Sequence, residues 1–265
     1  MMEKMIFGRY VPGESLLHRM DPRSKLIIVF LFVGIVFIAN NAWTYGVLAL
    51  YTLFMVGLSK IPPRFLYGGL KPIIFLVVFT FLLHIFMTKE GELVFELGWI
   101  KIYEEGIRQG IFISLRFFLL ILITSLLTLT TTPIEITDGL ETLLNPLKKV
   151  KFPVHELALM MSISLRFIPT LMQETDKIMK AQTARGVEYS SGPVKERVKA
   201  IVPLLIPLFI SSFKRAEELA VAMEARGYRG GEGRTKYRQL EWGIADTGMI
   251  LILALITILL IVLRG

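Results

Sequence analysis

Apolar residues along this chain gather into long runs instead of alternating with polar ones. Five of these runs reach or approach the roughly 17–25 residues that cross the hydrocarbon core of a bilayer. Backbone groups in lipid must be satisfied within their own segment, so each run predicts a helix, and the missing period-two alternation argues against a β-barrel. The predicted membrane spans are residues 25–39, 42–58, 72–87, 107–130 and 244–263.

The charges between these spans predict which ends face the cytoplasm. The loop over 59–71 carries Lys60, Arg64 and Lys71 and no acidic residue, whereas the loop over 88–106 carries five glutamates. Lysine and arginine accumulate in cytoplasmic loops. We therefore predict an all-α integral protein of the inner (plasma) membrane, with its N-terminus inside and its C-terminus outside.

Residues 131–243 break this pattern, because their apolar positions recur at three- and four-residue steps among many charges. The apolar run over 200–213 is only about 14 residues long and contains two prolines, so we predict that it does not cross the bilayer. The chain then divides into an N-terminal four-helix membrane part over 1–130, a cytoplasmic module over 131–243 and a C-terminal membrane helix over 244–265.

Two helices of this module are predicted to end in the same tripeptide, Ala184-Arg185-Gly186 and Ala225-Arg226-Gly227. A glycine just past a helix end stops the helix in the left-handed conformation, and an arginine there ordinarily offsets the helix dipole. Two copies on one side of the membrane would also present two matched, fork-shaped cations on helix tips. Such tips would suit the grooves of a two-fold partner, for example a nucleotide-hydrolysing dimer.

Composition and missing motifs narrow the function. The chain has no cysteine, which excludes disulfides and thiol catalysis, and His18, His84 and His155 are too scattered to predict a metal site or a cofactor. The net charge of +8 is attributed to cytoplasmic surface and not to nucleic-acid binding. The chain has no G-x-x-x-x-G-K-[ST] motif for ATP binding, and no H-E-x-x-H or G-x-S-x-G motif of hydrolytic enzymes, so no enzyme activity is predicted. If the protein drives an ATP-dependent process, a partner must hydrolyse the ATP.

Several of these segments together resemble one family, the T component (EcfT, CbiQ-like) of energy-coupling factor transporters. The resemblance covers nearly the whole length. It is carried by GESLLHRMDPRSKL at 13–26, TPIE at 132–135, PVHELALM at 153–160, LRFIPT at 165–170 and the two Ala-Arg-Gly motifs, the second extending to EARGY at 224–228.

The resemblance implies a complex and a division of labour. A T component pairs with two ABC ATPases, of A and A′ type, and with one membrane-embedded S component that binds a vitamin or a transition-metal ion. About five membrane helices and the cytoplasmic coupling helices would form an L-shaped scaffold, and Arg185 and Arg226 would anchor the two ATPases. The apolar faces of the coupling helices would hold the S component, through Met160, Met161, Ile168, Leu171, Met172, Leu205 and Phe209; an ordinary helix–helix core is the other interpretation.

Two further functions remain to be weighed. A self-contained carrier or channel would need paired intramembrane charges or inverted repeats with broken helices, and a membrane-embedded enzyme would need a cluster of His, Asp or Glu around one cavity. Arg116 is the clearest charge inside a predicted span, which makes it a candidate functional residue. It could equally extend to the interface or pair with a glutamate of the 88–106 loop.

Overall fold

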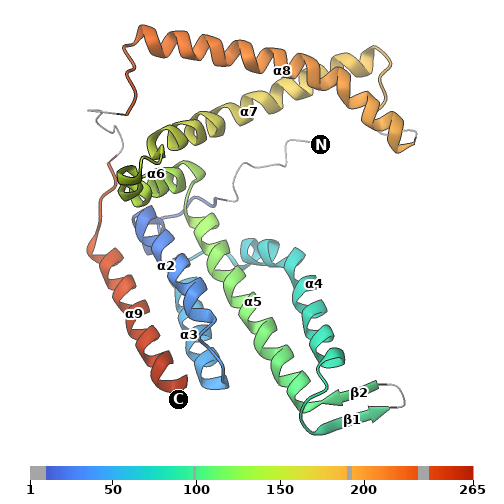
Figure 1. Cartoon of the computed structure of the whole chain (residues 1–265), viewed down its shortest axis with the longest axis vertical. Helices are drawn as coiled ribbons and strands as arrows, with labels where there is room; N and C mark the ends of the chain where they lie inside the picture. Colours follow the sequence, from blue (N-terminus) through green and yellow to red (C-terminus); the bar gives the residue numbers. More distant parts are fainter. Residues whose placement is uncertain (1–9, 98–99, 190–192, 232–238, 265) are drawn as a thin grey trace. The chain divides into compact units, whose positions relative to one another are not determined.

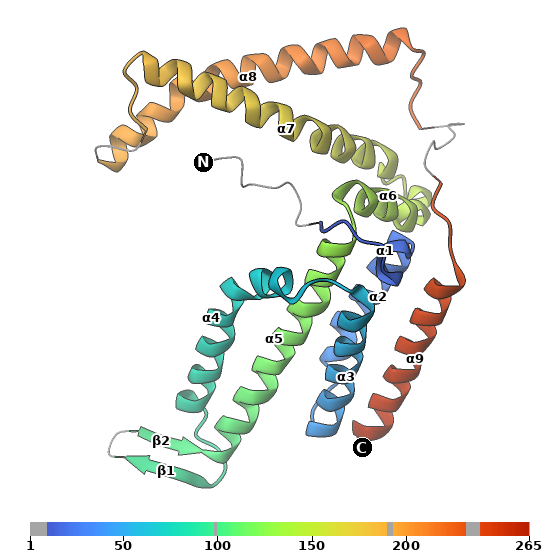
Figure 2. The same ribbon diagram turned by 180° about the vertical axis from the view of Figure 1, so that it is seen from behind.

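A computed structural model describes residues 10–97, 100–189, 193–231 and 239–264, and most of these residues are helical (Figures 1 and 2). The chain forms two compact units. The first unit comprises residues 1–143 and 239–265, and the second comprises residues 144–238. Each unit has its own packing and is described in turn.

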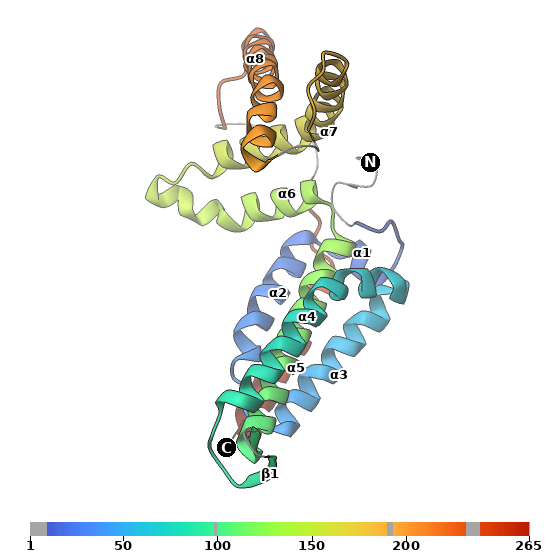
Figure 3. The ribbon, with the colours of Figure 1, turned by 90° about the vertical axis from the view of Figure 1, so that its right-hand side faces the viewer.

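The first unit is a bundle of helices with one short hairpin. In it, α2, α3, α5 and α9 pack together, and α4 packs along α5 (Figure 1). An antiparallel pair of strands connects α4 to α5 and lies at the end of that helix pair (Figure 3). The elements are α1 (Leu16–Arg19), α2 (Pro22–Val36), α3 (Ala42–Ser59), α4 (Pro63–Met87), β1 (Leu93–Leu97), β2 (Ile100–Tyr103), α5 (Glu104–Thr130), α6 (Pro133–Leu144) and α9 (Ile244–Arg264).

Local signals in the sequence account for where these helices begin. The Asp21 carboxylate caps α2, with Pro22 at the first helical position. Asn41 and Thr44 form a reciprocal capping box at the start of α3. The predicted box before α6 is confirmed, since the Thr132 N–H donates to Glu135 at 2.8 Å and the Glu135 N–H donates to the Thr132 hydroxyl at 3.3 Å.

The count of candidate membrane spans agrees with the prediction, but its members differ. By length and composition, α3, α5, α9 and α7 (Val154–Ala184) could each cross a membrane, and α4 adds a fifth if its two parts, bent by 55°, form one span. The predicted span over 25–39 corresponds to α2, which has 15 residues because Phe37 ends it. A helix of that length is only about 22 Å long. The predicted place of α7 in a cytoplasmic module therefore stays a prediction.

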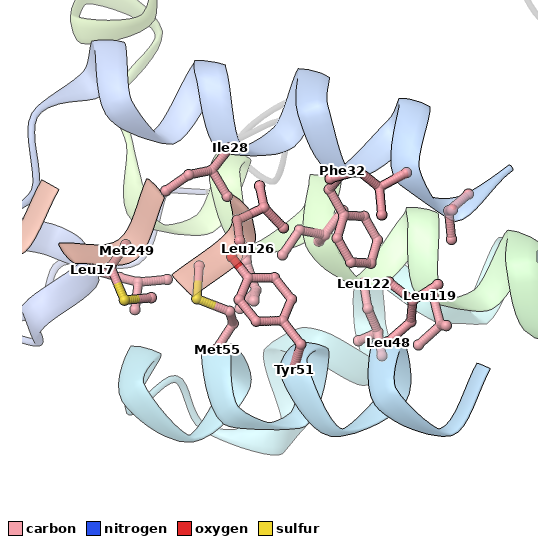
Figure 4. Close-up of a cluster of buried hydrophobic side chains, with 14 of the residues drawn as sticks. Leu17, Ile28, Phe32, Leu48, Tyr51, Met55, Leu119, Leu122, Leu126 and Met249 are labelled. Carbon is pink, nitrogen blue, oxygen red and sulfur yellow. The ribbon is translucent and has the colours of Figure 1, made fainter. Parts of the chain in front are cut away.

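The core of the first unit lies where α2, α3, α5 and α9 meet (Figure 4). Phe32 of α2 is fully buried and stacks on Tyr51 of α3, with 5.9 Å between ring centroids. Leu122 and Leu126 of α5 and Met249 of α9 close the cluster. These four helices therefore share one apolar core.

A buried polar cluster fastens the start of α9 to the start of α2. The Asp246 carboxylate accepts hydrogen bonds from the Asp21 N–H at 2.9 Å, the Gly243 N–H at 2.7 Å and the Ser24 hydroxyl. Asp21 in turn forms an ion pair with Arg23 at 2.7 Å. Much of the motif over 13–26 thus has a structural role, because its polar residues join two helices that are more than 200 positions apart.

The second unit contains η2 (Asn145–Val150), α7 and α8 (Val194–Ala225). The two long helices cross in antiparallel directions. Glu174 of α7 pairs with Arg215 of α8 at 2.8 Å and accepts a bond from the Ser211 hydroxyl, while the Gln182 amide donates to the Pro203 carbonyl at 3.3 Å. Among the described residues of α7 and α8, only Val154 and Ala158 are buried.

Candidate functional site

The first Ala-Arg-Gly motif forms the C-terminal tip of α7. Arg185 is the cap residue, and Gly186 follows it with φ of 90°. The Gly186 N–H donates to the Thr183 carbonyl and the Val187 N–H donates to the Gln182 carbonyl, each at 3.0 Å. This pair of bonds is a Schellman motif, which satisfies carbonyls that the end of a helix leaves unpaired.

The second motif has the same geometry at the tip of α8. Arg226 is the cap residue, with φ and ψ of −87° and 6° against −88° and 6° at Arg185. Gly227 has φ of 74°, its N–H donates to the Glu224 carbonyl at 2.9 Å, and the Tyr228 N–H donates to the Met223 carbonyl at 3.0 Å. The two tripeptides are therefore the same local structure built twice.

Both glycines are needed for their backbone conformation and not for space. A Cβ added at Gly186 or Gly227 would meet no atom of this chain within 4 Å, but the left-handed conformation disfavours any residue with a side chain. Ala184, Arg185, Ala225 and Arg226 are all exposed. Each tip therefore presents a small residue, a cation and a glycine to whatever lies outside the chain.

The two tips lie at opposite ends of the helix pair. The start of α8 is close to the tip of α7, and α8 then extends 32 residues, or about 48 Å, to its own tip (Figures 1 and 2). Beside the second tip, the Tyr228 hydroxyl lies 3.4 Å from Nε2 of His155 at the start of α7. The unit thus presents the two tips at separate places and not as one composite site.

The predicted apolar contact residues are distributed unevenly along α7 and α8. Met160, Met161, Leu205 and Phe209 are exposed, with 59% of Phe209 accessible, while the α7 residues nearer the crossing are half-buried. Those half-buried residues are Ile168, Leu171 and Met172.

The exposed face of α8 is larger than the sequence analysis recognised. Val202, Ile206 and Phe213 are also exposed, and with Phe209 they recur at steps of four, three and four. The sequence analysis named Leu205 and Phe209 of this run as contact residues, and the same helical spacing in residues 200–213 also points to Val202, Ile206 and Phe213. We call Val202, Leu205, Ile206, Phe209 and Phe213 the α8 apolar face.

Comparisons with known proteins identify the family. The family model described as cobalt transport protein (CbiQ) matches residues 13–237, which is most of the chain and includes both tips. The chain belongs to the CbiQ family. Curated relatives carry the name energy-coupling factor transporter transmembrane protein EcfT. One from Bacillus subtilis (strain 168) is 71% identical over 265 residues and covers 100% of both chains.

Two further relatives agree with this assignment. The protein of that name from Exiguobacterium sibiricum is 59% identical over 98% of this chain and 99% of its own. The one from Listeria innocua is 58% identical over 100% of each chain. This CbiQ-family chain is accordingly a transmembrane component of an energy-coupling factor transporter, which confirms the resemblance.

Other candidate residues of this CbiQ-family protein form no catalytic or metal centre in the part of the chain that the structure describes. No group of three His, Asp or Glu side chains there could hold a metal ion. Arg116 has no carboxylate partner among residues 10–97, 100–189, 193–231 and 239–264. Its guanidinium lies instead over the rings of Phe37 and Tyr45, at 5.1 and 6.0 Å.

Proposed function

We propose that this chain is the energy-coupling subunit of an ABC-type importer for vitamins or transition-metal ions. In this proposal, the α7 and α8 tips each dock into a groove of one of two ABC ATPases, with Arg185 and Arg226 as the anchors. The observation that carries the proposal is the repeated, exposed tip with matching backbone angles. A helix end that only needed a cap would not require an arginine at both copies.

The antiparallel crossing supports a mechanical role for the two tips. Because they lie at opposite ends of α7 and α8, two ATPases that approach one another on binding ATP would move the tips relative to each other. The crossing is held by the Glu174–Arg215 ion pair and few buried apolar contacts, so it can adjust at small cost. Such a shift is coupled to transport only if the partners contact its two states differently.

The α8 apolar face, together with Met160 and Met161, is where we propose that the S component binds. Exposed apolar side chains on a long helix are typical of contact surfaces, and methionine suits a surface that must adapt to several partners. In this arrangement the S component supplies the substrate specificity. The inward N-terminus, the outward C-terminus and the cytoplasmic place of the tips belong to the same proposal.

Removal of both anchors provides the test. We expect each single variant, Arg185→Ala or Arg226→Ala, co-expressed with the ATPases, to recover about tenfold less ATPase than the parent, and the double variant about a hundredfold less. Loss of an interface arginine commonly costs more than about 1 kcal/mol, and about 1.4 kcal/mol corresponds to a tenfold change in affinity. The measurement is affinity purification of the chain from solubilised membranes with quantification of bound ATPase, accompanied by substrate uptake in cells.

A matched control removes the same charge from the same helices. Arg166 of α7 and Lys214 of α8 are exposed and lie in the interior of their helices, away from both tips, so Arg166→Ala/Lys214→Ala should recover normal amounts of ATPase. In the cysteine-free parent, Glu188→Cys and Arg229→Cys should both react with an impermeant thiol reagent only from the cytoplasmic side. Normal ATPase recovery and uptake in the double tip variant would refute the docking proposal.

A further inference from the structure

A cavity of about 380 Å³ lies at one end of the first unit, away from the polar cluster of Asp246. The turn between α2 and α3, the first turns of α5 and the end of α9 enclose it. The Asn41 side chain donates to the Leu263 carbonyl at 2.8 Å and so holds the turn against the end of α9. The lining of the cavity includes Phe37, Tyr45, Glu105, Arg108, Arg116 and Arg264.

Cations dominate this lining. Arg108, Arg116 and Arg264 face one carboxylate, that of Glu105, which gives the lining a net charge of +2. The Glu105–Arg108 pair is long, at 3.9 Å, and the Arg108 guanidinium lies 5.7 Å from the Phe112 ring centre. The described residues therefore leave most of the positive charge in the cavity uncompensated, which favours an anionic ligand.

Arg116 has few hydrogen-bond partners in this cavity. Its Nε and the Tyr45 hydroxyl are buried, and neither has a hydrogen-bond partner among the described residues. Its one hydrogen bond, to the Ala39 carbonyl, is weak at 3.4 Å, and the faces of Phe37 and Tyr45 hold the guanidinium in place. Arg116 as a whole is half-buried and has no carboxylate partner among the described residues, so its position suits a ligand that brings a negative charge.

The residues around the cavity indicate what kind of anionic ligand would fit it. Trp43, in the first turn of α3, is 78% exposed, and Phe37 at the end of α2 is 60% exposed. Large aromatic side chains at the ends of membrane helices mark the level of the lipid headgroups. Exposed apolar residues of the last turn of α9, Ile261 and Val262, lie within three positions of Arg264 and would face acyl chains. The cavity thus sits where a headgroup and its chains would meet the protein.

We propose that this cavity binds the headgroup of an anionic phospholipid, with the phosphate held by Arg108, Arg116 and Arg264. Arginine recognises phosphate through two parallel N–H bonds, and a cavity of this size accommodates a glycerophosphate headgroup. The lipid would join α2, α5 and α9 at the end where the described residues provide few polar contacts between them. This role is independent of ATPase docking, which concerns residues of the second unit.

Titration of the purified full-length chain with defined lipids tests the proposal. By native mass spectrometry, we expect phosphatidylglycerol to bind at least about tenfold more tightly than phosphatidylcholine with the same acyl chains, the difference that a charge-assisted pair provides. The Arg108→Gln/Arg264→Gln variant should lose this preference. Both side chains are exposed, so the variant should fold. Lys89→Gln removes an exposed charge just before the hairpin, outside the cavity, and should keep the preference.

A second arm distinguishes a lipid from a free anion. Inorganic phosphate at millimolar concentration should not displace bound phosphatidylglycerol if the acyl chains contribute to binding. Displacement by phosphate would overturn the assignment to lipid. Equal affinity for the two lipids, or an unchanged preference in the double glutamine variant, would overturn the site itself.

Discussion

The two units of this chain obtain their order in different ways. In the first unit, α2, α3, α5 and α9 bury a contiguous apolar core, and polar residues at their ends are joined by buried hydrogen bonds. In the second unit, α7 and α8 have 31 and 32 residues, yet Val154 and Ala158 are the only buried positions among their described residues. The first unit buries its apolar residues in a core, and the second leaves most of its apolar residues exposed.

The comparison teaches how a coupling subunit can combine rigidity with adaptability. A helix pair with few buried contacts opens at small cost in free energy, because stability within a protein follows the local density of packing. Under the proposed function, partners would supply further contacts to α7 and α8, and their motion would reach these helices without disturbing the bundle. If this is correct, equivalent substitutions should have unequal effects in the two units.

The largest effect is expected at the polar cluster of the first unit. Asp246→Ala would leave the Asp21 N–H, the Gly243 N–H and the Ser24 hydroxyl without their shared acceptor, and we expect a loss of about 3 kcal/mol or more in the free energy of unfolding. Thermal or denaturant unfolding of the purified chain in detergent measures this. Glu241→Ala, at an exposed position five residues earlier, should change stability little. Equal losses in both variants would show that the cluster does not stabilise the bundle.

Truncating one phenylalanine in each unit compares how much each unit's packing contributes to stability. Phe32 is 0% exposed and Phe209 is 59% exposed. Phe32→Ala should lower the free energy of unfolding by about 2–4 kcal/mol, because it leaves a cavity among α2, α3 and α5, whereas Phe209→Ala should change it by about 0.5 kcal/mol or less. The same unfolding assay measures both. A large loss at Phe209 in the isolated chain would mean that this chain covers the α8 apolar face itself.

Much of this fold could be predicted from local sequence signals. Asp21-Pro22 and Thr132-Pro133 predict where two helices begin. The long apolar runs predict which segments can cross a membrane. The hairpin of β1 and β2 was not predicted, because each strand is short and lies in a loop whose glutamates dominated the analysis. The shortness of α2 was also missed, since an apolar run does not show where its backbone bonds stop.

The helix tips and the surroundings of Arg116 also differ in how far local sequence signals predict them. The tips at Arg185 and Arg226 were predictable because a glycine after a helix is a local signal. The partners of Arg116 were not, because Phe37 and Tyr45 are distant from Arg116 in the sequence and no spacing rule brings them together. The bond between Ser24 and Asp246 is equally non-local. Local chemistry predicts elements and caps, whereas clusters that join distant elements require the three-dimensional structure.

The smallest effect, and the sharpest test of the tips, concerns a single methyl group. Gly227 has φ of 74°, whereas Gly248 of α9 does not have positive φ. A Cβ added at either glycine would meet no atom within 4 Å. The variants Gly227→Ala and Gly248→Ala therefore differ in backbone strain and not in steric contacts. We expect Gly227→Ala to weaken the tip by about 1 kcal/mol and Gly248→Ala to be neutral or slightly stabilising. Hydrogen exchange at the Tyr228 amide, which donates to the Met223 carbonyl, should accelerate about fivefold in the first variant alone. Unchanged exchange would mean that the Schellman motif does not depend on glycine. The proposed ATPase docking would then depend on the arginine side chains and not on a backbone conformation fixed by glycine.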